Sequence, residues 1–79
     1  MRVHVKLFAT LGRLVPGTTP GTLFDVELPA GATVATLVSH LKLPMEEVKV
    51  AFINGRARPA DWVLNPDDQV GMFPPVGGG

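Results

Sequence analysis

The residues best suited to chemistry stand at the C-terminus, where residues 73–79 read FPPVGGG. The α-carboxylate of Gly79 is unhindered because glycine has no side chain, and it is the kind of carboxyl group that can be activated as an acyl-adenylate. Gly77 and Gly78 also lack a Cβ, so this end of the chain fits a channel too narrow for any other residue. We therefore predict that Gly78 and Gly79 thread into a narrow channel of a partner and carry the reactive group.

Two prolines precede the glycines. Pro74 and Pro75 lack backbone N–H groups and have a restricted φ, so the chain should leave the last strand as an extended arm that continues through Val76. Six extended residues reach on the order of 20 Å. A frayed end is the alternative interpretation, but a frayed end needs no Pro-Pro-Val spacer. We predict a folded domain over residues 1–73 and a flexible, extended tail over residues 74–79.

Two phenylalanines stand where the predicted strands end. Residues 2–8 (RVHVKLF) alternate between apolar and polar side chains, and Phe8 falls on the polar face. Residues 69–73 (QVGMF) end on Phe73, which is out of step with the valine and methionine before it. If these strands are parallel neighbours, the two rings lie side by side at the root of the tail and form a docking patch. The alternative is that loop residues cover both rings.

Composition excludes several classes of protein. The 79 residues suit one small domain, and seven basic and seven acidic side chains give no net charge, which argues against a nucleic-acid binder. The absence of cysteine excludes a disulfide scaffold, an iron–sulfur carrier and a thiol nucleophile. His4 and His40 are far apart in sequence and make a poor metal-ligand set, and we expect His4 to be a solvated surface residue. No signal peptide or membrane span is recognised, so we expect a cytoplasmic protein that does not bind membranes.

The remaining elements are predicted from periodicity. Residues 22–28 alternate as a second strand, and residues 9–15 have the spacing of a short helical turn. Thr33 is a predicted N-cap for the main helix, whose buried face has helical spacing. The residues of that face are Val34, Leu37, Val38 and Leu41. Leu43-Pro44 ends the helix.

The second half of the chain reads as three strands. Residues 48–53 are rich in β-forming side chains, and Asn54-Gly55 is the preferred pair for a type I′ hairpin turn into residues 56–58. Residues 69–73 form the last strand. The order β-β-α-β-β-β predicts an α+β protein with one main helix packed across one face of a mixed sheet. With the first and last strands central and parallel, this is a β-grasp (ubiquitin-like) roll.

With these elements in place, the sequence resembles the MoaD/ThiS family of ubiquitin-like sulfur carriers, and within it the MoaD branch, the small subunit of molybdopterin synthase. The ending FPPVGGG is similar to that branch's ending, with Gly77 at its variable position. The start VKLFATLGRLVPG (residues 5–17) is similar to the family's first strand and helix, and Phe8 matches an interface aromatic. FING (52–55) and LNPDDQV (64–70) match two further family patterns. Asp67 stands where the family usually has glycine, and Ala57 where relatives often carry a larger aliphatic residue.

The resemblance implies a mechanism in which the chain has no active site of its own. An E1-like adenylating enzyme would bind Phe8 and Phe73, use ATP and Mg²⁺ to adenylate Gly79, and let a sulfur donor system convert the adenylate into a thiocarboxylate. The partner contact would extend along the tail through Pro74, Pro75, Val76 and Gly77. The tail would then enter a larger molybdopterin synthase-type subunit, where sulfur passes to a pterin precursor. The chain itself would bind no cofactor and no metal.

Three alternatives stay open. The first is a sulfur carrier for tRNA thiolation or thiamine. The second is a ubiquitin-like modifier joined through Gly79 to substrate lysines, because a lysine amine can also take the activated acyl group. The third is a β-grasp interaction module whose tail has no chemical role.

Overall fold

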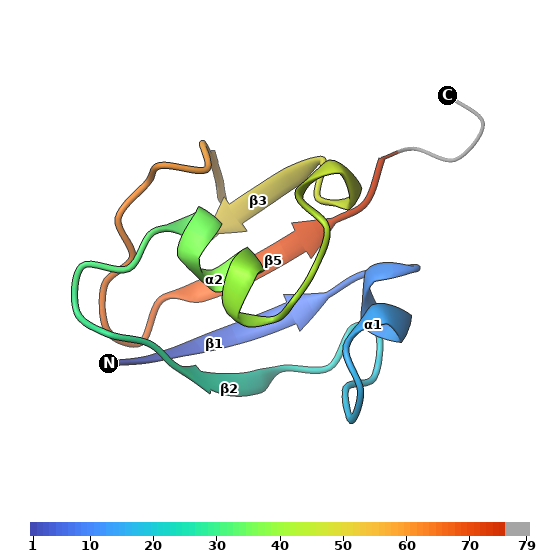
Figure 1. Cartoon of the computed structure of the whole chain (residues 1–79). Coiled ribbons are helices and arrows are strands. Elements are labelled where there is room, and N and C mark those ends of the chain that lie inside the picture. The colour runs from blue at the N-terminus through green and yellow to red at the C-terminus, as the bar shows by residue number, and fades with distance from the viewer. Residues whose placement is uncertain (76–79) are drawn as a thin grey trace.

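A computed structural model of the chain describes residues 1–75, and Val76 to Gly79 lie outside the described residues. The strands are β1 (Arg2–Leu7), β2 (Phe24–Glu27), β3 (Val50–Ile53), β4 (Arg56–Arg58) and β5 (Gln69–Phe73). They form one mixed sheet in the order β2-β1-β5-β3-β4 (Figure 1). The central strand β5 is parallel to β1 and antiparallel to β3. This is the predicted β-grasp roll, with its first and last strands adjacent and parallel.

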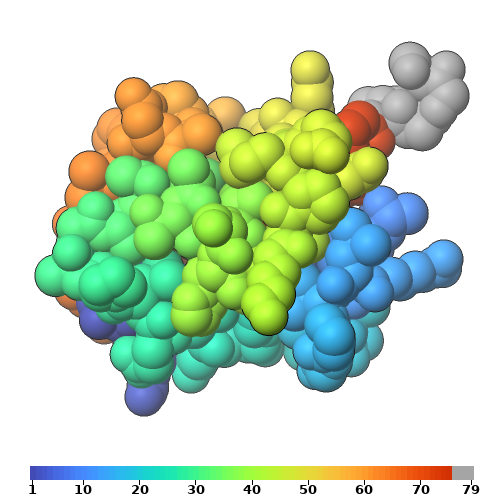
Figure 2. Space-filling model, viewed as in Figure 1, coloured from blue at the N-terminus to red at the C-terminus, as the bar shows by residue number. Residues whose placement is uncertain are grey.

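The main helix, α2 (Val34–His40), crosses one face of the sheet (Figure 1). Thr33 caps it as predicted. The backbone N–H of Thr36 donates to Thr33 Oγ1 (3.2 Å), and the backbone N–H of Thr33 donates to Thr36 Oγ1 (3.1 Å). This reciprocal pair gives partners to N–H groups that the helix itself leaves unbonded. In Figure 2, α2 and the chain after it (green to yellow-green) cover the middle of this side of the molecule.

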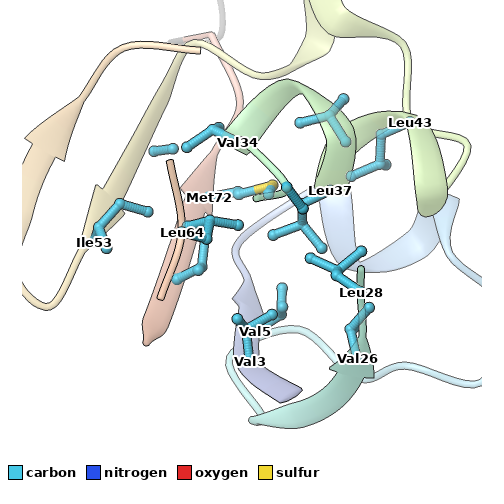
Figure 3. Packing of buried hydrophobic residues seen from close by; sticks show 14 of the residues in the cluster. Val3, Val5, Val26, Leu28, Val34, Leu37, Leu43, Ile53, Leu64 and Met72 are labelled. Carbon is cyan, nitrogen blue, oxygen red and sulfur yellow. The ribbon is translucent and has the colours of Figure 1, made fainter. Parts of the chain in front are cut away.

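The hydrophobic core lies between α2 and the sheet. Figure 3 shows Leu37 of α2 in the same cluster as Val5 and Met72. All three side chains have no exposed surface. The strand residues of the core alternate along the chain, as the sequence predicts: Val3, Val5 and Leu7 on β1, then Val70 and Met72 on β5. Because a domain this small has a single core, this face of the sheet supplies most of its hydrophobic stabilisation.

The first strand ends one residue earlier than predicted. Phe8 keeps one ladder bond, because its N–H donates to the Met72 carbonyl oxygen (3.1 Å). Ala9 then takes a left-handed conformation, with φ of +51°, and turns the chain out of the sheet. The predicted helical turn follows as the one-turn helix α1 (Leu11–Leu14).

The second and third strands begin two residues later than predicted. The N–H of Thr22 donates to the Thr19 carbonyl oxygen (3.1 Å), so that residue still belongs to a turn and β2 starts at Phe24. Before β3, the chain forms a short 3-10 helix, η1 (Met45–Glu47). The N–H of Val48 donates into that helix, and this delays the start of β3.

Local turn chemistry sets the hairpin between β3 and β4 and the turn before β5. Asn54 and Gly55 have φ of +52° and +86°, as the predicted type I′ hairpin requires. Asp67 has φ of +66°. Aspartate tolerates this left-handed conformation, so it can stand at a position where the sequence resemblance leads us to expect glycine. The buried carboxylate of Asp68 accepts hydrogen bonds from the N–H of Asn65 (2.8 Å) and from Asn54 Nδ2 (2.9 Å). The carboxylate of Asp68 therefore closes the turn that leads into β5.

Candidate functional site

The face of the sheet opposite α2, here called the open face, carries the aromatic residues at the root of the tail. Side chains alternate across a strand, so the residues between the core positions of β1 and β5 point to the open face. On β5 these are Gly71 and Phe73. On β1 they include Lys6, and Phe8 follows directly after the strand.

Phe8 and Phe73 lie side by side, as the sequence analysis predicts. Their ring centroids are 4.3 Å apart and their planes differ by 2°, so the rings are stacked. The cause is the parallel pairing of β1 with β5, in which Leu7 is opposite Met72. Both rings remain half-exposed, because no loop of the described residues covers them completely. Their role in binding a partner stays a prediction.

Phe52 on β3 is a third member of this cluster that the sequence analysis missed. Its ring meets that of Phe73 edge to face, with centroids 5.5 Å apart and an angle of 83°. A signal was available, because Phe52 lies between Ala51 and Ile53, which are buried, and so must face the other way. The pairing of Phe52 with Gly71 then brings it into the cluster.

The three rings surround a hollow of about 370 Å³ on the open face. Gly71 lies beneath it and contributes no side chain. Leu23, which is 45% exposed, and Lys6 lie at its border. The lining is mainly apolar, so the hollow suits an apolar side chain of another protein better than a charged one.

The root of the tail lies beside this hollow. The N–H of Lys49 donates to the Phe73 carbonyl oxygen (2.9 Å). Pro74 has no N–H to continue the ladder, so the strand stops there as predicted. Pro74 is half-buried and Pro75 is exposed. The predicted site residues Val76, Gly77, Gly78 and Gly79 lie outside the described residues, so their roles stay predictions.

The other end of the open face is charged. His4 Nδ1 lies 2.6 Å from Asp25 Oδ1, and His4 Nε2 lies 3.2 Å from Asp67 Oδ1. The hydrogen bond with Asp25, followed by that with Asp67, raises the pKa of His4 above its ordinary value of 6.5. Arg2 Nε pairs with Glu27 Oε1 at 2.8 Å. His4 is therefore more than a solvated surface residue, because it links β1, β2 and the turn before β5.

Two searches of residues 1–75 complete the description of the site. In this part of the chain no group of three histidine, aspartate or glutamate side chains is arranged to hold a metal ion. None of the helices described is long and apolar enough to cross a membrane.

Comparisons with known proteins agree with this fold. A family model described as the ThiS family matches residues 5–79. A solved structure of a Pyrococcus furiosus protein assigned as molybdopterin converting factor, subunit 1 has a TM-score of 0.73 at 31% sequence identity, and the match covers 96% of this chain and 99% of that one. Small archaeal modifier protein 1 of Haloferax volcanii has a TM-score of 0.73 at 21% identity, with 95% of this chain and 98% of that chain covered. The second likeness shows the fold alone. No curated protein matches the sequence significantly.

Proposed function

Because the chain belongs to the ThiS family, whose model matches residues 5–79, we propose that it is a sulfur carrier for the biosynthesis of molybdopterin. In this proposal Gly79 holds the sulfur as a C-terminal thiocarboxylate. The molybdopterin branch is favoured by the ending FPPVGGG. It is also favoured by the 31% identity to a protein assigned as a molybdopterin converting factor subunit.

The observation that carries the proposal is the stacked pair of Phe8 and Phe73 at the root of the tail. A pair of half-exposed rings at the ends of two adjacent strands, β1 and β5, gives a partner a rigid apolar anchor. Phe73 is followed directly by Pro74 and Pro75, which favour an extended backbone. A partner that binds the rings is therefore in position to take up the residues that follow.

The chemistry requires activation of the Gly79 carboxylate, because a carboxylate is a poor electrophile. One carboxylate oxygen attacks the α-phosphorus of ATP on the adenylating enzyme, and pyrophosphate leaves. Sulfide (HS⁻) released by the donor system then attacks the acyl carbon and AMP leaves, which produces the thiocarboxylate. ATP and Mg²⁺ belong to the adenylating enzyme in this scheme, and the chain supplies the docking surface and the reacting carboxyl group.

The second half of the cycle delivers the sulfur. A thiocarboxylate is ionised at neutral pH and is a strong nucleophile. We propose that the tail enters a larger subunit whose basic residues neutralise the terminus. There the sulfur attacks a pterin precursor, and water then cleaves the acyl–sulfur bond, which leaves the sulfur on the pterin and returns the Gly79 carboxylate. Two such transfers build the dithiolene that binds molybdenum or tungsten.

The experiment is an intact-mass measurement of the chain isolated from its native cells, with an immunoblot for larger conjugates. A mass increase equal to the exchange of one oxygen for sulfur, located on Gly79 by fragmentation, is the expected result. The matched control is the chain without Gly79, which should keep its fold and show no such shift.

Other outcomes select the alternatives. An unshifted mass together with high-mass conjugates that require Gly79 supports a protein modifier instead. If neither signal is present, the chain is an interaction module. The thiocarboxylate can also be present in the same amount whether pterin synthesis is blocked or active. In that case the acceptor is a tRNA base or a thiamine precursor.

A further inference from the structure

The hollow on the open face is bounded by Phe8, Phe52 and Phe73 and has Gly71 as its floor, and we call it the socket. It is formed by three different strands or their ends, so its shape depends on the sheet rather than on a mobile loop. The stacked and edge-to-face contacts of the three rings hold its walls in place. A rigid concave surface of this kind accepts one apolar side chain at low entropic cost.

The backbone conformation does not require glycine at Gly71, and the missing side chain leaves space beside the rings of Phe8 and Phe73. Its φ is not among the positive values, in contrast to Gly55. Glycine inside a strand weakens the strand relative to alanine. A Cβ at this position would lie 3.3 Å from Phe8 Cε2 and 3.9 Å from Phe73 Cε1. A glycine inside a strand often marks the close approach of a ligand or a second chain.

Lys6 supplies the second observation, which concerns charge. On the open face of β1, Arg2 pairs with Glu27 and His4 pairs with Asp25, both on β2. The alternation continues to Lys6, which shares the lining of the socket with the apolar Leu23, the residue directly before β2. Lys6 lines the socket and forms no ion pair with any of residues 1–75.

Among residues 1–75, Lys6 is also the only charged residue that lines the socket. If a partner fills the socket with an apolar group and places a carboxylate next to it, that carboxylate can pair with Lys6. This pair would follow those of Arg2 with Glu27 and His4 with Asp25 along β1. The complementary partner surface is therefore apolar in the middle and acidic at the border with β2.

We propose that the enzyme that adenylates Gly79 inserts one apolar side chain into the socket over Gly71 and places a carboxylate next to it that pairs with Lys6. This inference rests on the proposed function, since it specifies the contact surface of that same enzyme. It assigns two residues beyond the aromatic pair: Gly71 sets the depth of the socket, and Lys6 sets the orientation of the partner. Both act through binding and take no part in the chemical step.

The test is carrier-dependent ATP–pyrophosphate exchange by the purified adenylating enzyme of the source organism, with the concentration of the chain varied. Gly71→Ala fills the floor, and Lys6→Glu reverses the charge at the border. Each should raise the half-saturating concentration about tenfold or more and leave the maximal exchange rate unchanged, because the tail is intact. Lys42→Glu, an identical change at the exposed turn after α2, is the matched control and should change neither quantity.

Two further measurements make the result specific. Urea unfolding should show that Gly71→Ala and Lys6→Glu still unfold cooperatively from a folded state, which excludes misfolding. A zero-length carbodiimide, which joins an amine and a carboxylate as an amide with loss of water, should couple Lys6 to an acidic residue of the enzyme. Changing that acidic residue to lysine should restore the affinity of Lys6→Glu.

The outcomes separate this inference from the proposed function. If the parent chain supports exchange and both variants have its half-saturating concentration, the socket inference is wrong and the carrier function stands. If the parent chain supports no exchange at all, both fall together. A Lys6 cross-link that is absent while Lys42 forms one would also overturn the inferred orientation.

Discussion

Alternate residues of β1 and β5 face opposite sides of the sheet and have opposite surroundings. Val5 and Met72 are completely buried under α2. Phe8 and Phe73, from the same two strands or their ends, stay half-exposed on the open face. One face of the sheet, here called the covered face, is covered by α2. No helix within residues 1–75 covers the open face. Stability and partner binding should therefore be separable by mutations on the two faces.

The largest expected effect is on the covered face. Leu37→Ala removes a completely buried side chain at the centre of α2. The loss should be about 2–5 kcal/mol of the free energy of unfolding, from lost burial and the cavity that remains. Urea denaturation measures it, and half-saturation of the adenylating enzyme by the folded chain should not change. A loss below about 1 kcal/mol would show that the covered face is not the main source of stability.

A pair of phenylalanines on opposite faces gives the sharpest comparison. Phe24 on β2 is half-buried like Phe73, but it is opposite Val5 and packs against the core. Phe24→Ala should cost about 2 kcal/mol of stability, less than for a completely buried ring, and leave partner binding unchanged. Phe73→Ala should weaken binding about tenfold or more and cost about 1 kcal/mol of stability through the lost ring contacts.

Titration calorimetry with the adenylating enzyme and urea unfolding of both variants measure the two quantities. The opposite pattern, with a large stability loss and unchanged binding for Phe73→Ala, would make the open-face rings part of the core.

A smaller effect is expected at the start of α2. Thr33→Ala removes the side-chain oxygen that accepts the N–H of Thr36 and should cost about 1 kcal/mol of stability. Thr33→Ser keeps that oxygen and serves as the control. Equal unfolding midpoints for the two variants would show that the reciprocal cap adds nothing to the covered face.

The smallest effect belongs to the charged end of the open face and depends on pH. The pKa of His4 is raised in the folded chain, chiefly by the hydrogen bond with Asp25 and then by that with Asp67. A raised pKa means that protonated His4 stabilises the fold fully below its unfolded pKa of about 6.5. This contribution is lost as pH rises through the folded pKa.

His4→Gln is the test of this titration. The stability difference between the parent chain and the variant should therefore shrink as pH rises above about 6.5. Urea unfolding at low salt measures this stability difference across the pH range. A difference that stays constant across the range would show that the two carboxylates are not coupled to His4 in solution.

Much of the fold could be predicted from local patterns. The alternation of Val3, Val5 and Leu7 identifies a strand with one buried face, and Thr33 identifies the start of α2. Asn54-Gly55 identifies the hairpin turn. Strand ends were less predictable, because they depend on single hydrogen bonds such as that from Thr22 to Thr19, which periodicity does not contain.

The candidate site was predictable in part for the same reason. Phe8 and Phe73 were identified because each is out of step with its strand and stands next to the tail. Phe52 was missed because the alternation shows that it faces away from Ala51 and Ile53 but does not show which strand lies beside it. Gly71 was missed as well, since a glycine in a strand is informative only when its neighbours are known.

The sequence by itself determined which face each strand residue occupies, where α2 begins, and that the chain carries the ending FPPVGGG. Only the tertiary structure decided that Phe52 pairs with Gly71, that Lys6 forms no ion pair within residues 1–75, and that His4 meets Asp67, 63 positions further along the chain. The physical reason is that side-chain direction follows from local backbone geometry. Strand order and register instead come from the simultaneous burial of distant segments against one core.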